Sequence, residues 1–399
     1  MSAGRRVRIT LCGPFPLDDE DLRNADGLLH SIVNLGTSLQ RVPQLDVHVV
    51  SRSSKVRIET EATILGLPVT FVPDPRPAID YLLDRRLLTG RLVRALKRLR
   101  PDLVHAHGEP QFIFAALRYG GPHVITLQSL YKDQTLPAAT RPPLKYRFAY
   151  WCLRRWERSY LPEIRNLLAI NDAIASYVRE VVPSVRVFRT TNTAGESFFA
   201  VSGTDSQPII LCVSQISQRK GIHDLLAAFA RIVSRVPGSQ LRIAGGEVQD
   251  APYATRLREQ YSTLIEAGQV VFLGGLRHEE IREELARCRV FCLASLYEAS
   301  PLAVAEAMAA AKPVVATRVG DLEELVGAGK SGILVDPGDV GALAAGLEKV
   351  LTMSSEERAQ MGSRGREMAR RRAHPDVAAR DAVAAYQTIL GEGTTGLVR

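Results

Sequence analysis

Short apolar runs alternate with helix-forming segments along this chain, and this alternation is what most constrains its fold. The clearest example begins with the apolar run Val290–Leu293, which indicates a buried strand. Ser300 and Pro301 then supply an N-cap and a first-turn proline for the helix formers of Leu302–Ala311. Val314–Thr317 begins the next strand. The pattern predicts a strand–loop–helix–strand unit whose loop lies at the carboxyl end of a parallel sheet, where ligands bind.

Two carboxylates, Glu298 and Glu306, stand inside this unit. Glu298 precedes the expected helix and Glu306 falls on its second turn, so both project toward one crevice from different heights. The free N–H groups of Ala299–Ala303, including those of Ser300, Leu302 and Ala303, would form an anion site between them. A diphosphate on these amides, with sugar hydroxyls on either side, suits the layout. The alternative is a solvated loop glutamate followed by a partner for the helix dipole.

The length of the chain favours two domains. At 399 residues it exceeds the roughly 250 to 300 residues at which a single core stops growing. Its 46% hydrophobic and 24% charged residues are those of a globular protein and exclude collagen-like and disordered classes. The Gly-, Ser- and Pro-rich segment 194–208 predicts a linker. We therefore expect α/β domains over 1–200 and 201–374, then a last helix and frayed tail over 375–399.

The net charge of +8 is unevenly placed. Residues 1–200 hold 28 Lys and Arg against 19 Asp and Glu, whereas the remainder holds 23 against 24. A basic first half indicates an anionic surface or substrate as its partner. A nucleic-acid partner is not expected, because the sequence has no zinc-ligand spacing, no aromatic RNA-binding signature and no continuous basic helix.

The cysteines and the amino-terminal segment favour a cytoplasmic protein. Five scattered cysteines, an odd number, argue against a disulfide framework and for a reducing compartment. The amino-terminal segment lacks the apolar region of a signal peptide, and no apolar run reaches about 18 residues.

The segment Lys145–Tyr160 interleaves five arginines and lysines with six aromatic residues at helical spacing. An interfacial helix has this composition, with aromatic rings at the headgroups and cations on anionic lipid. We therefore expect peripheral contact with an anionic membrane surface on its inner face. The alternative is a helix packed on the protein by Phe148, Trp151 and Trp156, with its basic positions in solvent.

The first half contains two further candidate site residues. Gly27 would open a helix after the long polar loop that follows the strand Arg8–Cys12, so its backbone could approach a ligand. The alternative is a plain turn. The strand 102–107 carries two histidines on one face. His107 lies at its carboxyl end, so we expect a site role for His107 and a core position for His105.

The second half offers a phosphate site and two glycine pairs. Lys220 stands at a helix start after the strand Ile209–Val213, from which its charge can bind phosphate. The two-glycine frame of a P-loop is absent. Gly245 begins a glycine pair after the next strand, and a second pair precedes Leu276. Such pairs let the backbone approach a base or ribose, or simply form turns.

Lys220, the Glu298/Glu306 pair and the segment Lys312–Thr317 (KPVVAT) together resemble the family-4 glycosyltransferases, retaining enzymes of the GT-B architecture. The resemblance is strongest over Leu211–Pro337. Two glutamates separated by seven residues, followed by this segment, are specific to that family. The resemblance implies an α/β GT-B fold of two facing Rossmann-like domains with parallel sheets and a cleft between them, the last helix returning to the first domain.

The resemblance also implies a role for each matching residue. Glu306 would hold the ribose of a nucleotide-diphospho-sugar donor, Glu298 would contact the transferred sugar, and Lys220 would neutralise the leaving diphosphate. From the first domain, Gly27 would approach the diphosphate and His107 would hydrogen-bond the sugar near the reacting carbon. Family members generally work without a metal, so we expect neither a metal nor a tightly bound cofactor.

One position departs from the family pattern. The family usually has Gly-Arg five residues before the phosphate lysine, where this chain has Ser214 and Gln215. A missing cation weakens stabilisation of the leaving group. Gln215 can still donate a hydrogen bond, so we include it with Gly245 and Leu276 among the donor-binding positions. Arg219 is the candidate to replace the charge; otherwise the donor or the rate differs, or activity is lost.

The expected function is transfer of a sugar, with retention, to a glycan, lipid-linked or small-molecule acceptor in polysaccharide or glycolipid biosynthesis. Two other functions stay open at this point. A non-hydrolysing sugar-nucleotide epimerase shares the architecture and donor but would carry additional acid–base groups around the sugar. A catalytically weakened protein that only binds nucleotide sugars is the second, and Gln215 is its best support.

Overall fold

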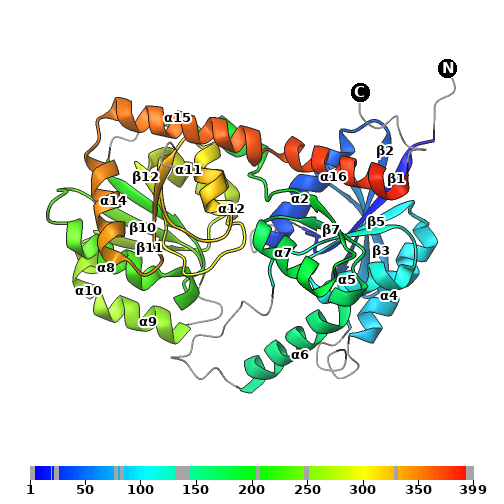
Figure 1. Cartoon of the computed structure of the whole chain (residues 1–399). Helices are drawn as coiled ribbons and strands as arrows, with labels where there is room; N and C mark the ends of the chain where they lie inside the picture. Colours follow the sequence, from blue (N-terminus) through cyan, green and yellow to red (C-terminus); the bar gives the residue numbers. More distant parts are fainter. Residues whose placement is uncertain are drawn as a thin grey trace. The chain divides into compact units, whose positions relative to one another are not determined.

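The computed structural model of the chain divides into two compact α/β units, each built on its own sheet (Figure 1). The structure describes residues 5–18, 20–21, 27–75, 80, 85–130, 144–203, 207–246, 251–327 and 331–391. Of these, unit 1 contains the residues up to 191 and those from 375 onward, and unit 2 contains 192–374. Unit 1 is thus assembled from both ends of the chain.

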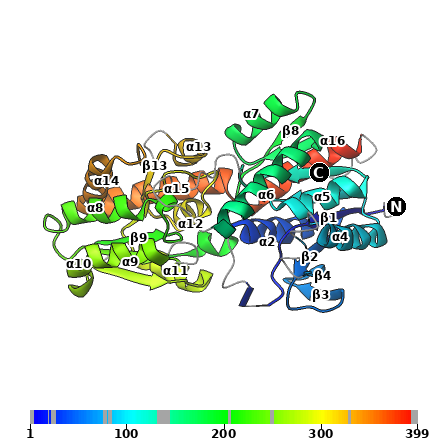
Figure 2. The same ribbon diagram turned by 90° about the horizontal axis from the view of Figure 1, so that it is seen from below.

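The sheet of unit 1 has eight strands in the order β3-β4-β2-β1-β5-β6-β7-β8. They are β1 Val7–Cys12, β2 Leu45–Ser53, β3 Thr60–Ile64, β4 Leu67–Pro73, β5 Leu103–His107, β6 His123–Thr126, β7 Asn166–Ala169 and β8 Arg186–Arg189. All neighbours pair parallel except β3 with β4. The sequence pattern did not predict β3, because its alternating exposed and half-buried residues carry little hydrophobic signal. Figure 2 shows β3 outside β4 and β2.

The helices of unit 1 follow hydrophobic periodicity and local capping. In the described part of the chain they are α2 Gly27–Gln40, α4 Arg86–Leu99, α5 Pro110–Tyr119, α6 Leu144–Tyr160, α7 Asp172–Val181 and α16 Pro375–Leu390. Helix α4 buries Leu88, Leu92 and Leu96 at four-residue spacing. Asn171 caps α7 by accepting a hydrogen bond from the backbone N of Ile174 at 2.8 Å.

The sheet of unit 2 has the order β11-β10-β9-β12-β13-β14, and all neighbours pair parallel. Its strands are β9 Ile209–Val213, β10 Gln240–Ala244, β11 Val270–Gly274, β12 Val290–Leu293, β13 Val314–Thr317 and β14 Gly332–Val335. Its described helices are α8 Ile222–Ile232, α9 Ala251–Gln260, α10 Ser262–Glu266, α11 His278–Arg287, α12 Leu302–Ala309, α13 Leu322–Val326, α14 Val340–Thr352 and α15 Ser355–Arg372. Because the strands are parallel, their carboxyl ends share one edge.

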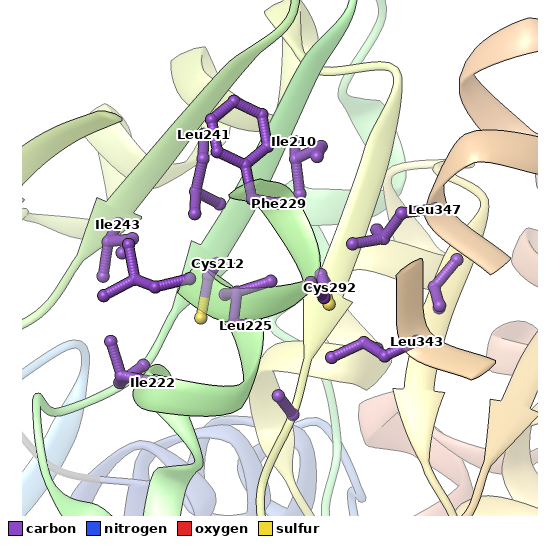
Figure 3. Close-up of a cluster of buried hydrophobic side chains, with 14 of the residues drawn as sticks. Ile210, Cys212, Ile222, Leu225, Phe229, Leu241, Ile243, Cys292, Leu343 and Leu347 are labelled. Carbon is purple, nitrogen blue, oxygen red and sulfur yellow. The ribbon is translucent and has the colours of Figure 1, made fainter. Parts of the chain in front are cut away.

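Alternate residues of β9 enter two apolar clusters on the two faces of this sheet. Ile210 and Cys212 pack with α8 and α14, and Ile209 and Leu211 pack with α11 and α12. Figure 3 shows the first cluster, where Cys212 of β9 and Cys292 of β12 lie among aliphatic side chains. Burial on both faces explains the near-continuous apolar runs that made these strands predictable. All five cysteines of the chain are free and buried.

The segment after β8 differs from the linker predicted over 194–208. Phe198 is fully buried in the cluster with α11 and α12, and the backbone N of Ala194 donates to the carbonyl of Ala373 at 2.9 Å. The chain therefore enters unit 2 between 191 and 192, earlier than the boundary expected at 200/201, and leaves it between 374 and 375. Residues Glu196–Ala200 form a short 3-10 helix that packs into this cluster, which sequence composition cannot distinguish from a linker.

Helix α16 belongs to the core of unit 1. It buries Ala382, Val383 and Tyr386 in the cluster that includes β1 and α2. The Tyr386 hydroxyl lies 2.7 Å from Nδ1 of His105, and Nε2 of His105 lies 2.7 Å from Oγ1 of Thr126. Burial lowers the pKa of His105 well below its ordinary value, so the ring is neutral. A buried chain of polar groups thus ties the last helix to β5 and β6.

Tyr386→Phe should destabilise unit 1 by about 1 to 3 kcal/mol, because it leaves the His105 ring nitrogen buried without a partner. Tyr386→Ala should cost about 3 to 5 kcal/mol, since it also leaves a cavity. Urea unfolding followed by circular dichroism measures both. Thr388→Ala, an exposed change on the same helix, is the control and should stay within about 0.5 kcal/mol. Wild-type stability of Tyr386→Phe would contradict the role of this network.

Candidate active site

The loop of residues 294–301, which follows β12, is the centre of the carboxyl edge of unit 2. On the side of β9, the backbone N of Leu296 donates to the carbonyl of Arg219 at 2.8 Å. Gly221 has a φ of 62°, and a Cβ there would lie 1.9 Å from the carbonyl oxygen of Ala294. Only glycine lets the two loops approach this closely. The residue after the expected phosphate lysine therefore fixes the β9 loop against the β12 loop.

The β13 side holds the same loop at its beginning and its end. Oγ1 of Thr317 donates to the carbonyl oxygen of Ser295 at 2.5 Å. Oγ of Ser300 donates to Oδ2 of Asp321 at 2.7 Å. Because strands β9, β12 and β13 are neighbours in the sheet, all three loops meet here, and the 294–301 loop is clamped between two others.

The start of α12 corrects one detail of the sequence prediction. Pro301 occupies the N-cap position and α12 begins at Leu302, so Ser300 is not the cap and Pro301 is not its first residue. The Ser300 hydroxyl bonds Asp321 instead, a partner that sequence separation conceals. The backbone N–H groups of Leu302 and Ala303 lie in the first turn, where an α-helix offers them no carbonyl of its own.

Glu298 is 8% exposed, which excludes the solvated loop residue that the sequence left open. Nζ of Lys220 lies 2.5 Å from its Oε1, and Nη1 of Arg219 lies 3.3 Å from its Oε2. Ser295 Oγ also donates to Oε1, at 2.7 Å. Burial favours the neutral acid, but the charges of Lys220 and Arg219 and these hydrogen bonds outweigh it and lower the pKa of Glu298. Two cations therefore share one carboxylate, which leaves an excess positive charge.

Glu306 is 4% exposed on α12, and burial raises its pKa to about 8. It is thus largely neutral at pH 7 and does not act as an ionised partner of the helix dipole. Oε1 of Glu306 lies 3.8 Å from Nε2 of His278, whose ring packs edge-on against Phe198 with centroids 5.3 Å apart. The sequence did not reveal His278 as a site residue; its only signal was a position at the start of α11, directly after the loop of β11.

Three other expected donor-binding residues follow strands at this same edge. The side chain of Gln215, after β9, is exposed. A Cβ on Gly245, after β10, would lie 1.8 Å from the carbonyl oxygen of Ser214, so this glycine permits contact within the protein. Leu276, after β11, packs on the cluster of α11 and α12.

His107 and Gly27 lie in unit 1, and the other expected site residues lie in unit 2. His107 is 2% exposed at the end of β5 and packs against His105, with ring centroids 4.0 Å apart and ring planes tilted by 33°. Neither ring nitrogen of His107 has a hydrogen-bond partner within the described part of the chain. Burial lowers its pKa to about 3, so the ring is neutral. Gly27 opens α2, where Leu28 sits against Gly108, the residue after His107.

The described residues show neither a metal-binding group nor a spanning helix. No three His, Cys, Asp or Glu side chains among them are arranged to hold a metal ion. Within the same residues, no helix has the length and apolar character needed to cross a membrane.

Comparison with known proteins agrees with this arrangement. Residues 195–368 match the model of group 1 glycosyl transferases, and residues 25–190 match that of glycosyltransferase family 4. Over 281 residues the chain is 30% identical to alpha-maltose-1-phosphate synthase of Mycolicibacterium smegmatis. The aligned region covers 63% of this chain and 69% of that protein. The chain belongs to glycosyltransferase family 4. The resemblance seen in the sequence is thereby confirmed.

Other similarities of this family-4 protein extend over most of its length. It is 30% identical over 261 residues to glycogen synthase of Mycobacterium tuberculosis, which covers 63% of this chain but only 60% of that enzyme. Sucrose-phosphate synthase of Thermosynechococcus elongatus superposes with a TM-score of 0.75 at 20% identity, over 96% of this chain and 99% of that one. Anabaena HepE in complex with UDP-glucose superposes with a TM-score of 0.66 at 16% identity, over 95% of this chain and 99% of that one. These structures confirm the GT-B fold of two Rossmann-like units.

The raised pKa of Glu306 predicts a pH-dependent stability. An unfolded glutamate titrates near 4.5 and the folded one near 8, so the folded protein holds an extra proton between these values. Stability therefore falls as the pH rises through this window. Relative to wild type, Glu306→Gln should gain more than about 1 kcal/mol between pH 5 and pH 9.

Urea unfolding at a series of pH values measures this difference. Glu356→Gln, which removes an exposed carboxylate from α15, is the matched control and should leave the pH profile unchanged. If the difference between Glu306→Gln and wild type were constant from pH 5 to pH 9, Glu306 would not carry the buried proton.

Proposed function

We propose that this family-4 protein transfers a sugar, with retention, from a nucleotide-diphospho-sugar to a glycan, lipid-linked or small-molecule acceptor. The observation that carries the proposal is the pair of cations on buried Glu298, next to the amino-terminal amides of α12. A diphosphate is the anion that both features favour, because helix amides and cations stabilise phosphate oxygens together. That Anabaena HepE was crystallised with UDP-glucose supports a donor of this kind.

In the proposed complex the diphosphate takes over the cations that Glu298 now holds. Lys220 and Arg219 would neutralise its oxygens, and the released carboxylate of Glu298 would accept hydrogen bonds from the transferred sugar. The 39% exposed side chain of Arg219 has room to reorient, whereas that of Lys220 is only 16% exposed. Arg219 would thus supply the charge that Gln215 lacks.

The remaining donor contacts follow from burial and position. Glu306, protonated or ionised, has oxygens that can accept hydrogen bonds from ribose hydroxyls. From unit 1, the neutral ring of His107 offers one donor and one acceptor nitrogen to the sugar near the reacting carbon. Its buried nitrogens, without protein partners in the described chain, support this role, because buried polar groups are normally satisfied. We assign Gly27, at the start of α2, to the diphosphate as well.

Departure of the nucleoside diphosphate creates an oxocarbenium-like carbon and a leaving group with extra negative charge. Preorganised cations that meet this charge are the largest source of rate enhancement available to such a site. We propose that the acceptor hydroxyl attacks from the face that the diphosphate leaves, with a diphosphate oxygen taking its proton, which retains the configuration. We assign no step to a metal or a bound cofactor. The free cysteines of the chain favour a cytoplasmic location.

A direct assay separates this function from its alternatives. The purified chain is mixed with radiolabelled UDP-, GDP- and ADP-sugars together with lipid extracts and oligosaccharides. Label in a new glycan or lipid supports transfer. Conversion of the donor without an acceptor product indicates the epimerase, and binding without turnover indicates the weakened binding protein; either result would overturn the proposal.

Lys220→Ala and Glu306→Ala should each lower kcat/KM more than tenfold, which is more than about 1.4 kcal/mol of transition-state stabilisation. The first change removes charge at the diphosphate and the second removes the ribose contact. Lys349→Ala, an exposed lysine on α14, is the control and should retain full activity. Near-wild-type donor turnover in either site variant would refute its assignment.

Arg219→Ala should lower kcat/KM at least tenfold, and by more than Gln215→Ala, because only Arg219 adds charge beside Lys220. Calorimetry should show weaker binding of nucleoside diphosphate but unchanged binding of the nucleoside, which lacks phosphate. A matched change of an exposed arginine, Arg235→Ala on the loop after α8, should alter neither. If Gln215→Ala were the more damaging of the two, the replacement of charge by Arg219 would be wrong.

A further inference from the structure

Helix α6 packs on unit 1 with one face only. Cys152, Trp156 and Tyr160 follow at four-residue spacing and are all buried. The Tyr160 ring meets Phe114 of α5 edge-on, with centroids 5.9 Å apart, and Arg85 lies over the Trp156 ring at 5.8 Å. Figure 1 shows one end of α6 against the rest of unit 1, with the other half of the helix reaching away from the sheet of that unit.

The opposite face of α6 exposes two large aromatic rings. Phe148 is 53% exposed and Trp151 is 57% exposed, although most residues of their size are buried in this protein. Their rings stack on each other, with centroids 6.1 Å apart and planes 23° apart. The sequence left open that Phe148, Trp151 and Trp156 all pack on the protein. Only Trp156 does so; Phe148 and Trp151 do not pack into the described core.

The charges on this face all have one sign. Arg147, Arg155 and Arg158 are exposed beside the two rings, and Arg155 lies 5.9 Å from the Trp151 ring centroid. Positions 148, 151, 155 and 158 are three or four residues apart and therefore share one helix face. The single acidic residue of α6, Glu157, is buried.

We propose that the face of α6 formed by Phe148, Trp151, Arg155 and Arg158, with Arg147 beside it, docks unit 1 on an anionic lipid surface. Aromatic rings at the level of the headgroups bury apolar area, and arginines at the same depth meet phosphate and carboxylate groups of the lipids. A protein partner would have to offer an apolar pocket and acidic groups together, whereas an anionic lipid surface offers both at once. The inference stands on these contacts and not on the proposed sugar transfer.

Tryptophan fluorescence can measure this docking directly. The chain has two, the exposed Trp151 and the buried Trp156. With vesicles of phosphatidylcholine containing 30% phosphatidylserine at low salt, emission of the wild type should shift to the blue, and brominated lipid should quench it. Trp151→Phe should bind the same vesicles in sedimentation but lose the shift. Phosphatidylcholine alone should bind at least tenfold more weakly.

Variants of the face separate its apolar and charged parts. Phe148→Ser/Trp151→Ser should lower the vesicle partition coefficient at least tenfold. Arg155→Glu/Arg158→Glu should lower it more than about twentyfold, since each surface cation contributes about fivefold. Ile58→Ser, at a 75% exposed apolar residue of unit 1, and Lys97→Glu/Arg100→Glu on and just after α4 are the matched controls and should bind like the wild type.

Thermal unfolding and circular dichroism establish that each variant is folded, and activity on a soluble acceptor should be unchanged in both α6 variants. The proposal is overturned if the folded wild type does not sediment with anionic vesicles at low salt, or if the α6 variants bind as well as the controls. Self-association that Phe148→Ser/Trp151→Ser abolishes, without vesicle binding, would likewise overturn it and assign the face to a second copy of the chain.

Discussion

The ion pairs of the buried carboxylate of Glu298 hold together the loops at the carboxyl edge of unit 2. Removing an ionised carboxylate from water costs several kcal/mol unless opposite charge and hydrogen bonds compensate. Lys220, Arg219 and Ser295 provide both, which draws the turn after β9 and the loop after β12 together. Gly221 permits the approach, and Thr317 and Asp321 brace the far side. The loops are thus shaped before any ligand arrives, so a ligand pays little to order them.

The two units present different chemistry at the carboxyl ends of their sheets. Unit 2 gathers cations and carboxylates, a set that meets phosphate and hydroxyl groups. At the end of β5, unit 1 instead brings together two neutral imidazoles, which can hydrogen-bond without adding charge. This division suits a reaction in which charge develops on the leaving group while the carbon must be reached by a neutral hydroxyl. Under the proposed function, a neutral His107 would not compete with the cations of unit 2 for the diphosphate.

Sequence predicted the strands of unit 2 well, because burial on both faces makes β9, β12 and β13 continuous apolar runs. It also placed Glu298, Glu306 and Lys220 correctly at a strand-to-helix edge. It missed β3, whose residues are exposed or half-buried. It also missed α5, because the apolar residues of this helix begin shortly after the apolar run of β5. Partners such as Arg219 with Glu298, or His278 with Glu306, come together only when neighbouring strands pair, and no local pattern records that pairing.

The return of α16 to unit 1 also sets the order in which the chain can be completed during synthesis. Domains fold as units while the chain emerges, and residues 192–374 are whole before α16 has been made. Until then the core of unit 1 lacks Val383 and Tyr386, and its side chains from β1 and α2 stay uncovered. The unit that is second in the sequence is therefore the first whose residues have all been synthesised. A chain cut short after residue 374 would keep a complete unit 2 beside an open, aggregation-prone unit 1.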